Sequence, residues 1–167
     1  CRFIIMKKLL LLLLFIPFMS VGQITYHDLM SINSVDTFKK VVIENGFEFD
    51  SSNDDTIWYG WNIVKDSING NKSSKWAKYT PSTGAFIFTI SRTDILSSWA
   101  KTNPDNSNNE YDLIVEDIKS KCKYFEIKKN DGNDFVTYSC SESSYKGKLG
   151  FMVAEGSGFI RHFPPQD

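Results

Sequence analysis

The sequence predicts an α+β fold in which two tandem units each place two helices before four antiparallel strands. Two observations support this prediction. Segments with apolar residues at every third or fourth position stand at the start of each half of the chain, and runs rich in β-branched and aromatic residues follow them. The breaks between these runs are short and rich in Ser, Asn, Asp and Gly, which favours tight turns and antiparallel pairing.

The N-terminal segment, residues 1–22, predicts an export signal that precedes the folded domain. Two lysines are followed by an apolar run over residues 9–16, and the small residues Ser20 and Gly22 suit cleavage after Gly22. The run is too short to cross about 30 Å of hydrocarbon as a helix, which disfavours the alternative of a transmembrane anchor. Residues 1–5 precede the first Met and are expected to be upstream readthrough. We therefore expect a secreted or periplasmic product with no stable membrane anchor after signal cleavage.

The charge of the mature chain limits the classes of partner. Three of the 19 basic residues leave with the signal, so 16 basic residues face 20 acidic ones and the net charge is −4. Phosphate binding needs a basic surface, and the acidic balance therefore argues against a nucleic-acid partner. The remaining length of about 145 residues suits one compact domain, or two small repeats that share a core.

The first unit covers residues 23–90 and begins with two helices. Thr25 and Asp28 have the spacing of a capping box at the start of the first helix. The second helix begins at Ser34 and is expected to stop at Gly46, since a glycine often follows the last helical turn. Four strands are then expected, at residues 47–49, 57–64, 75–79 and 85–90.

The second unit covers residues 91–167 and repeats this order. Ser91 and Asp94 repeat the helix cap, a polar loop follows, and the apolar spacing predicts another helix over residues 110–121. Four further strands are expected at residues 124–128, 135–140, 149–154 and 159–163. The alternative is that any α+β chain can be divided by eye into two similar halves without a true repeat.

This order of elements resembles that of the β-lactamase inhibitor protein family. In that family, two tandem units of helix-loop-helix and four strands form a concave sheet that grips a partner enzyme. The resemblance covers Thr25 to Phe163 and rests on element order. It implies an antiparallel sheet with helices on one face, and a shared fold does not by itself imply a shared function.

Two cysteines of the mature chain, Cys122 and Cys140, flank a predicted β-hairpin. Its strands cover residues 123–129 and 134–140 around an Asp-Gly turn, which is a strong hairpin signal. A two-residue turn pairs Lys123 with Cys140 and leaves Cys122 one residue away from its partner, so a small bulge would align the two thiols. An oxidising compartment favours a disulfide. The alternative is two free buried thiols.

No motif for catalysis, metal binding or a cofactor stands out in the sequence. The spacings of zinc-ligand, phosphate-loop and nucleophile-elbow motifs are missing. We interpret His27 and His162 as surface or core residues, and a Cys–His nucleophile has no supporting motif. The acidic clusters at 54–55 and 131–134 lie in predicted turns and lack the spacing of a calcium loop. We therefore expect no catalytic residue, no metal ligand and no cofactor.

Aromatic residues provide the remaining functional signal. Trp58, Trp76 and Tyr124 each alternate with apolar neighbours, so we expect their rings on the sheet face opposite the helices. The alternative is that these rings pack under loops or under a second layer. Around Trp58, the same alternation predicts that the core face of the strand carries Ile57, Tyr59, Trp61 and Ile63.

These features predict a secreted, non-enzymatic binding module that presents an aromatic sheet face to a protein or another extended ligand. Trp and Tyr are enriched among the residues that dominate binding energy at interfaces. Two alternatives remain open: a small secreted hydrolase with an unrecognised site, and a structural envelope protein. An enzyme would show a cleft in which acid, base or nucleophile side chains converge. A binding module would instead show a broad sheet face with few titratable groups.

Overall fold

Eight antiparallel strands form one sheet with the order β1-β2-β3-β4-β8-β7-β6-β5. The computed structural model describes residues 23–91, 110–141, 144 and 146–165. Within these residues the expected α+β class with an antiparallel sheet is confirmed. The predicted export signal and the helix expected after Ser91 lie outside the described residues. The strands are β1 (Phe47–Asn53), β2 (Thr56–Trp61), β3 (Lys75–Thr80), β4 (Ala85–Ser91), β5 (Lys123–Asn130), β6 (Asn133–Ser139), β7 (Lys148–Ala154) and β8 (Ser157–Phe163).

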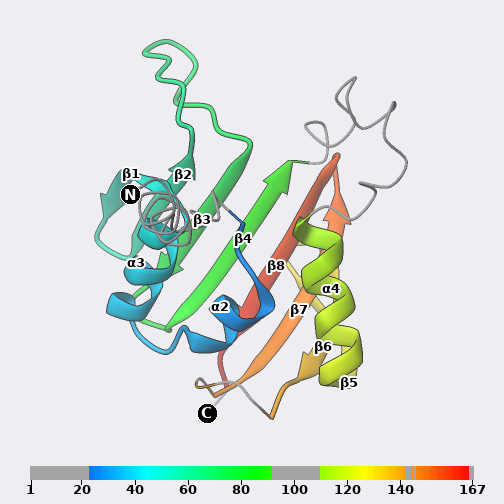
Figure 1. Cartoon of the computed structure of the whole chain (residues 1–167). Coiled ribbons are helices and arrows are strands. Elements are labelled where there is room, and N and C mark those ends of the chain that lie inside the picture. Colours follow the sequence, from blue (N-terminus) through cyan, green and yellow to red (C-terminus); the bar gives the residue numbers. More distant parts are fainter. Residues whose placement is uncertain (1–22, 92–109, 142–143, 145, 166–167) are drawn as a thin grey trace, which may run out of the picture.

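The helices of the described residues lie on one face of the sheet (Figure 1). They are α2 (Tyr26–Ser31), α3 (Val35–Glu44) and α4 (Glu110–Lys121). The predicted capping box is present at α2, where Thr25 and Asp28 each accept the other's backbone N–H through a side-chain oxygen. The Ser34 hydroxyl accepts the N–H of Thr37 and caps α3. Gly46, at a φ of +76°, then turns the chain from α3 into β1.

One hydrophobic core lies between the helices and the sheet. Phe38 of α3 is fully buried, and its ring lies 6.0 Å from that of Tyr59 and 5.1 Å from that of Tyr79, measured between centroids. The apolar face of α4 belongs to the same core. Pairing of β4 with β8 places Phe88 directly opposite Ile160. The core is therefore continuous between the two halves of the sheet.

The hairpin between β5 and β6 turns at Asp131 and Gly132, as predicted. Both residues have a positive φ, 50° and 81° respectively. A positive φ at both central residues is typical of the type I′ hairpin turn, whose twist matches the right-handed twist of the two strands. Asn130 pairs with Asn133 on either side of the turn.

A β-bulge in β5 aligns the two cysteines. From the turn onward the pairing follows the simple hairpin register, and Phe125 is then left unpaired. Lys123 consequently pairs with Ser139. Cys122 thus comes to lie opposite Cys140, with 4.5 Å between their Cα atoms. The predicted disulfide is confirmed, together with the bulge that it requires.

Strand β2 ends at Trp61 and is shorter than predicted. Asn62 adopts a positive φ of 51°, which interrupts the alternation of side chains. A Cβ atom placed on Gly60 would lie 2.8 Å from Cγ1 of Ile63 and 2.9 Å from Cζ3 of Trp76. Gly60 pairs with Trp76, and its Cβ position lies on the sheet face that points away from the helices. The Ile63 side chain therefore lies on that face as well. The expectation that Ile63 lies on the core face is therefore wrong.

We expect a Cys122→Ser/Cys140→Ser double variant to unfold with a free energy about 3 kcal/mol lower than that of the oxidised mature protein, because the disulfide closes a short loop in the unfolded chain. Guanidinium titration followed by circular dichroism measures the difference. Wild-type protein reduced with dithiothreitol serves as the control and should match the double variant. Equal stability of the oxidised and reduced proteins would contradict the prediction.

Candidate functional site

The sheet face that points away from the helices is the candidate site, and we call it the open face. No helix of the described residues lies on it (Figure 1). Its members follow from the register, because residues paired directly across antiparallel strands share a face. They include Glu48 and Ser51 of β1, Trp58 and Gly60 of β2, Trp76 and Lys78 of β3, Ile87 and Thr89 of β4, Phe159, Arg161 and Phe163 of β8, Lys148, Gly150 and Met152 of β7, Phe135, Thr137 and Ser139 of β6, and Lys123, Glu126 and Lys128 of β5.

Trp58 and Trp76 lie side by side on the open face. Their rings meet edge to face, with 6.3 Å between centroids. The Lys78 ammonium lies 5.3 Å from the centroid of the Trp58 ring. Both indoles are half-buried. Together with Asp50, Ser51 and Thr89 they line a shallow hollow of about 280 Å³.

Tyr124 lies on the other face of the sheet, the one that faces the helices. It pairs with Tyr138, whose ring stacks on the core residue Phe151 at a centroid distance of 5.6 Å. The bulge at Phe125 shifts the side-chain alternation of β5 by one residue. The expectation that Tyr124 shares a face with the two tryptophans is therefore wrong. Its side chain is 54% exposed at the edge of the sheet.

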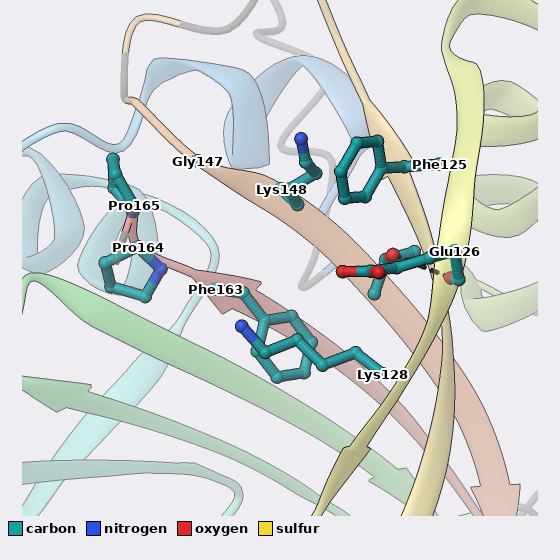
Figure 2. Close-up of a pocket in the computed structure, with 9 residues that line it drawn as sticks. Phe125, Glu126, Lys128, Gly147, Lys148, Phe163, Pro164 and Pro165 are labelled. Atoms are coloured by element: carbon teal, nitrogen blue, oxygen red, sulfur yellow. Dashed lines mark hydrogen bonds between the residues drawn. The ribbon is translucent and has the colours of Figure 1, made fainter. Parts of the chain in front are cut away.

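A second hollow lies on the part of the open face that β5, β6, β7 and β8 form, and we call it the lysine cleft (Figure 2). Its volume is about 400 Å³. No sequence motif predicts this cleft, although Glu126 and Lys128 stand at alternate positions and two prolines follow Phe163. Its lining consists of Phe125, Glu126, Lys128, Thr137, Gly147, Lys148, Phe163, Pro164 and Pro165.

Two glycines shape the lysine cleft. A Cβ atom on Gly150 would lie 2.7 Å from Cε2 of Phe163 and 3.1 Å from Cγ2 of Thr137. The Phe163 ring therefore occupies space that any other side chain at position 150 would fill. At Gly147, φ is +125° and a Cβ atom would collide with the carbonyl oxygen of Phe163. The Phe163 ring also packs edge to face on Phe135, at a centroid distance of 5.3 Å, which holds it in place.

Two ammonium groups line the lysine cleft, each against an aromatic ring (Figure 2). The Nζ atom of Lys148 lies 3.2 Å from the centroid of the Phe125 ring, and that of Lys128 lies 5.2 Å from the centroid of the Phe163 ring. Neither lysine takes part in a salt bridge with another residue that the structure describes. Both ammonium groups are therefore available to an anionic ligand.

A buried ion pair lies on the helix side of the sheet, away from both hollows. The Nζ atom of Lys75 lies 2.5 Å from Oε2 of Glu110, and the other carboxylate oxygen accepts the backbone N–H of Ile24. Burial raises the pKa of Glu110, while the charge of Lys75 and the N–H of Ile24 oppose this rise. The pair connects the segment before α2 with β3 and α4. We therefore assign it a structural role, and no local sequence signal predicts it, because its three residues are far apart in the chain.

The other residues that could act as a base, a nucleophile or a metal ligand have structural roles or lie apart from one another. His162 is buried, its ring nitrogens lie 3.1 Å and 2.9 Å from the carbonyl oxygens of Gly84 and Lys146, and burial lowers its pKa. Cys122 and Cys140 form the disulfide, so neither is a free nucleophile. In the described part of the chain, no group of three or more His, Cys, Asp or Glu side chains could hold a metal ion.

Comparison with known proteins gives no functional assignment. No known protein family, curated protein sequence or solved structure matches this chain. Among the described helices, none has the length and apolar composition needed to span a membrane. The function must therefore be inferred from the open face, which carries the tryptophan pair on β2 and β3 and the lysine cleft over β5 to β8.

The raised pKa of Glu110 predicts an unusual dependence of stability on pH. Between the ordinary Glu value of 4.5 and the raised value, the folded protein binds more protons than the unfolded chain. The contribution of Glu110 to the free energy of unfolding is thus largest below pH 4.5 and falls as the pH rises through the raised pKa.

We expect the stability of the wild type relative to a Glu110→Gln variant to decrease as the pH rises through this window. Urea titrations of both proteins at a series of pH values measure the difference, and the other carboxylates cancel because both proteins carry them. A difference that stays constant or grows with pH would show that the pKa of Glu110 is not raised.

Proposed function

We propose that the mature chain is an exported, non-enzymatic binding module that docks a partner protein on its open face. The main support is the half-buried Trp58–Trp76 pair, which lies on a sheet face that no described helix covers. Indole rings offer a large, rigid contact area, and Trp is enriched among the residues that dominate binding energy. The hollow that they line gives a partner side chain a place to insert.

The distribution of charge supports a partner with an acidic surface. The mature chain is acidic overall, whereas the open face of the six strands from β3 to β5 in the sheet order carries five cationic side chains and one carboxylate. A basic face on an acidic protein steers an acidic partner towards that face. The five cations are Lys78, Lys123, Lys128, Lys148 and Arg161, and the carboxylate is Glu126.

The two halves of the sheet are tandem units in this proposal. The strand orders β1-β2-β3-β4 and β5-β6-β7-β8 run towards each other from opposite edges and meet where β4 pairs with β8. This arrangement supports the resemblance in element order to the β-lactamase inhibitor protein family, in which a concave sheet grips an enzyme. The Cys122–Cys140 disulfide is compatible with export to an oxidising compartment.

The proposal predicts that Trp58→Ala and Trp76→Ala variants stay folded and lose the partner. Each substitution should cost clearly less stability than Phe88→Ala, for which about 3–5 kcal/mol is expected because that ring is buried in the core. Each should weaken binding of the partner by about 30-fold or more, which corresponds to about 2 kcal/mol. Thermal unfolding measures the first effect, and affinity capture on immobilised mature protein measures the second.

Ile43→Ala provides a matched control, because Ile43 is an apolar residue of α3 that is 59% exposed on the helix side. A protein that is captured by the wild type and by this control, but by neither tryptophan variant, is the expected partner. If both tryptophan variants unfold, the rings belong to a second core layer and the proposal fails. It also fails if the tryptophan variants retain every protein that the control retains.

A further inference from the structure

The lysine cleft has a net positive lining in an acidic protein. Two lysines and one glutamate provide its charges. Next to the cleft, the guanidinium of Arg161 lies 5.3 Å from the centroid of the Phe163 ring, opposite Gly150 in the neighbouring strand. Its carboxylate neighbour, Asp131, is 3.8 Å away and 85% exposed at the hairpin turn, so water weakens this pair. The cleft therefore attracts an anion.

The positions of the two ammonium groups are set by aromatic rings. An ammonium over the face of a ring gains about 0.5–1 kcal/mol at an exposed site, which positions the group and leaves N–H donors unused. At Lys148 and Lys128 the rings are those of Phe125 and Phe163. Donors held in this way can form short, charge-assisted hydrogen bonds with a carboxylate that enters the cleft.

Glu126 limits the charge that the lysine cleft can accept. Its carboxylate belongs to the same lining as the two lysines. The lining carries a net charge of +1, so a singly charged carboxylate neutralises it, whereas a doubly charged phosphate would leave an excess negative charge beside Glu126. The chemistry of the lining thus favours a carboxylate over a phosphate.

The remaining surface of the cleft is apolar. The Phe163 ring forms its floor, and Phe125, Pro164 and Pro165 form its sides (Figure 2). Its volume, about 400 Å³, exceeds what a carboxylate alone would fill. Apolar surface next to the two ammonium groups suits a ligand in which an aliphatic side chain lies beside the acidic one.

We propose that the lysine cleft binds an acidic side chain and its apolar neighbour in an extended segment of the partner protein. This inference rests on the proposed function, since the cleft and the tryptophan pair lie on the same face. The carboxylate bonds to Lys128 and Lys148, and the apolar side chain packs on Phe163 and the two prolines. The cleft thereby selects partners that present an Asp or Glu beside an aliphatic residue.

The test uses the oxidised mature protein and two blocked tetrapeptides as probes, Ser-Glu-Leu-Ser and Ser-Gln-Leu-Ser. Two-dimensional amide NMR reports where each peptide binds and how tightly. We expect the glutamate peptide to shift the amide signals of Lys128, Lys148 and Phe163, and to bind about fivefold or more tightly than the glutamine peptide. Added sodium chloride should weaken the binding.

Lysine variants separate a built site from a general charge effect. Lys128→Gln and Lys148→Gln should each weaken binding of the glutamate peptide by about fivefold or more. Lys129→Gln is the matched control, because Lys129 is the next residue of β5, is exposed, and alternation points it away from the open face. It removes the same charge without touching the cleft, and we expect it to leave the affinity unchanged.

Each of the following results would overturn the inference. One is equal binding of the two peptides, and another is a loss with Lys129→Gln as large as with the cleft variants. The third is inorganic phosphate that shifts the same amides at lower concentration than the glutamate peptide, which would indicate a phosphate site. If neither peptide binds while Trp58→Ala still abolishes capture of the partner, the proposed function stands and only the inference about the lysine cleft is wrong.

Discussion

The pairing of β4 with β8 is the interaction on which the rest of the structure depends. At this pair, two four-stranded meanders become one eight-stranded sheet, and Phe88 meets Ile160 with 1% and 0% of their surfaces exposed. A half of this size alone buries a smaller fraction of its surface than the whole chain does. Joining the halves gives the helices of both halves one common core to cover. It also makes the open face continuous.

Trp58 in one hollow of the open face lies far from Lys128 in the other, and this limits what can contact both of these side chains. Six strand spacings separate β2 from β5 in the sheet. At about 4.8 Å each, these spacings amount to roughly 29 Å. A small molecule cannot span that width, whereas a folded protein or an extended segment can. A protein partner therefore agrees with the geometry of the tryptophan pair and of the lysine cleft together.

Local signals predicted the elements well, and single residues with unusual backbone conformations caused the errors. The capping box at Thr25 and the disulfide of Cys122 with Cys140 depend on neighbours in sequence or on one hairpin, so they could be predicted. Tyr124 was placed on the wrong face because a bulge reverses the alternation, and Ile63 because Asn62 turns the chain. A pattern with a period of two residues cannot show where one such residue interrupts it.

The sequence by itself determined the local features of this protein: helix starts, the hairpin turn, the number and order of the strands described, and the cysteines available to pair. The tertiary structure alone decided which side chains meet across distant strands. Lys128 and Lys148 border one cleft because Gly150 lets the Phe163 ring lie between their strands. Register across a sheet depends on every strand between two residues, and a shift of one position moves a side chain to the other face. For that reason the open face could be expected from the sequence, while its second hollow could not.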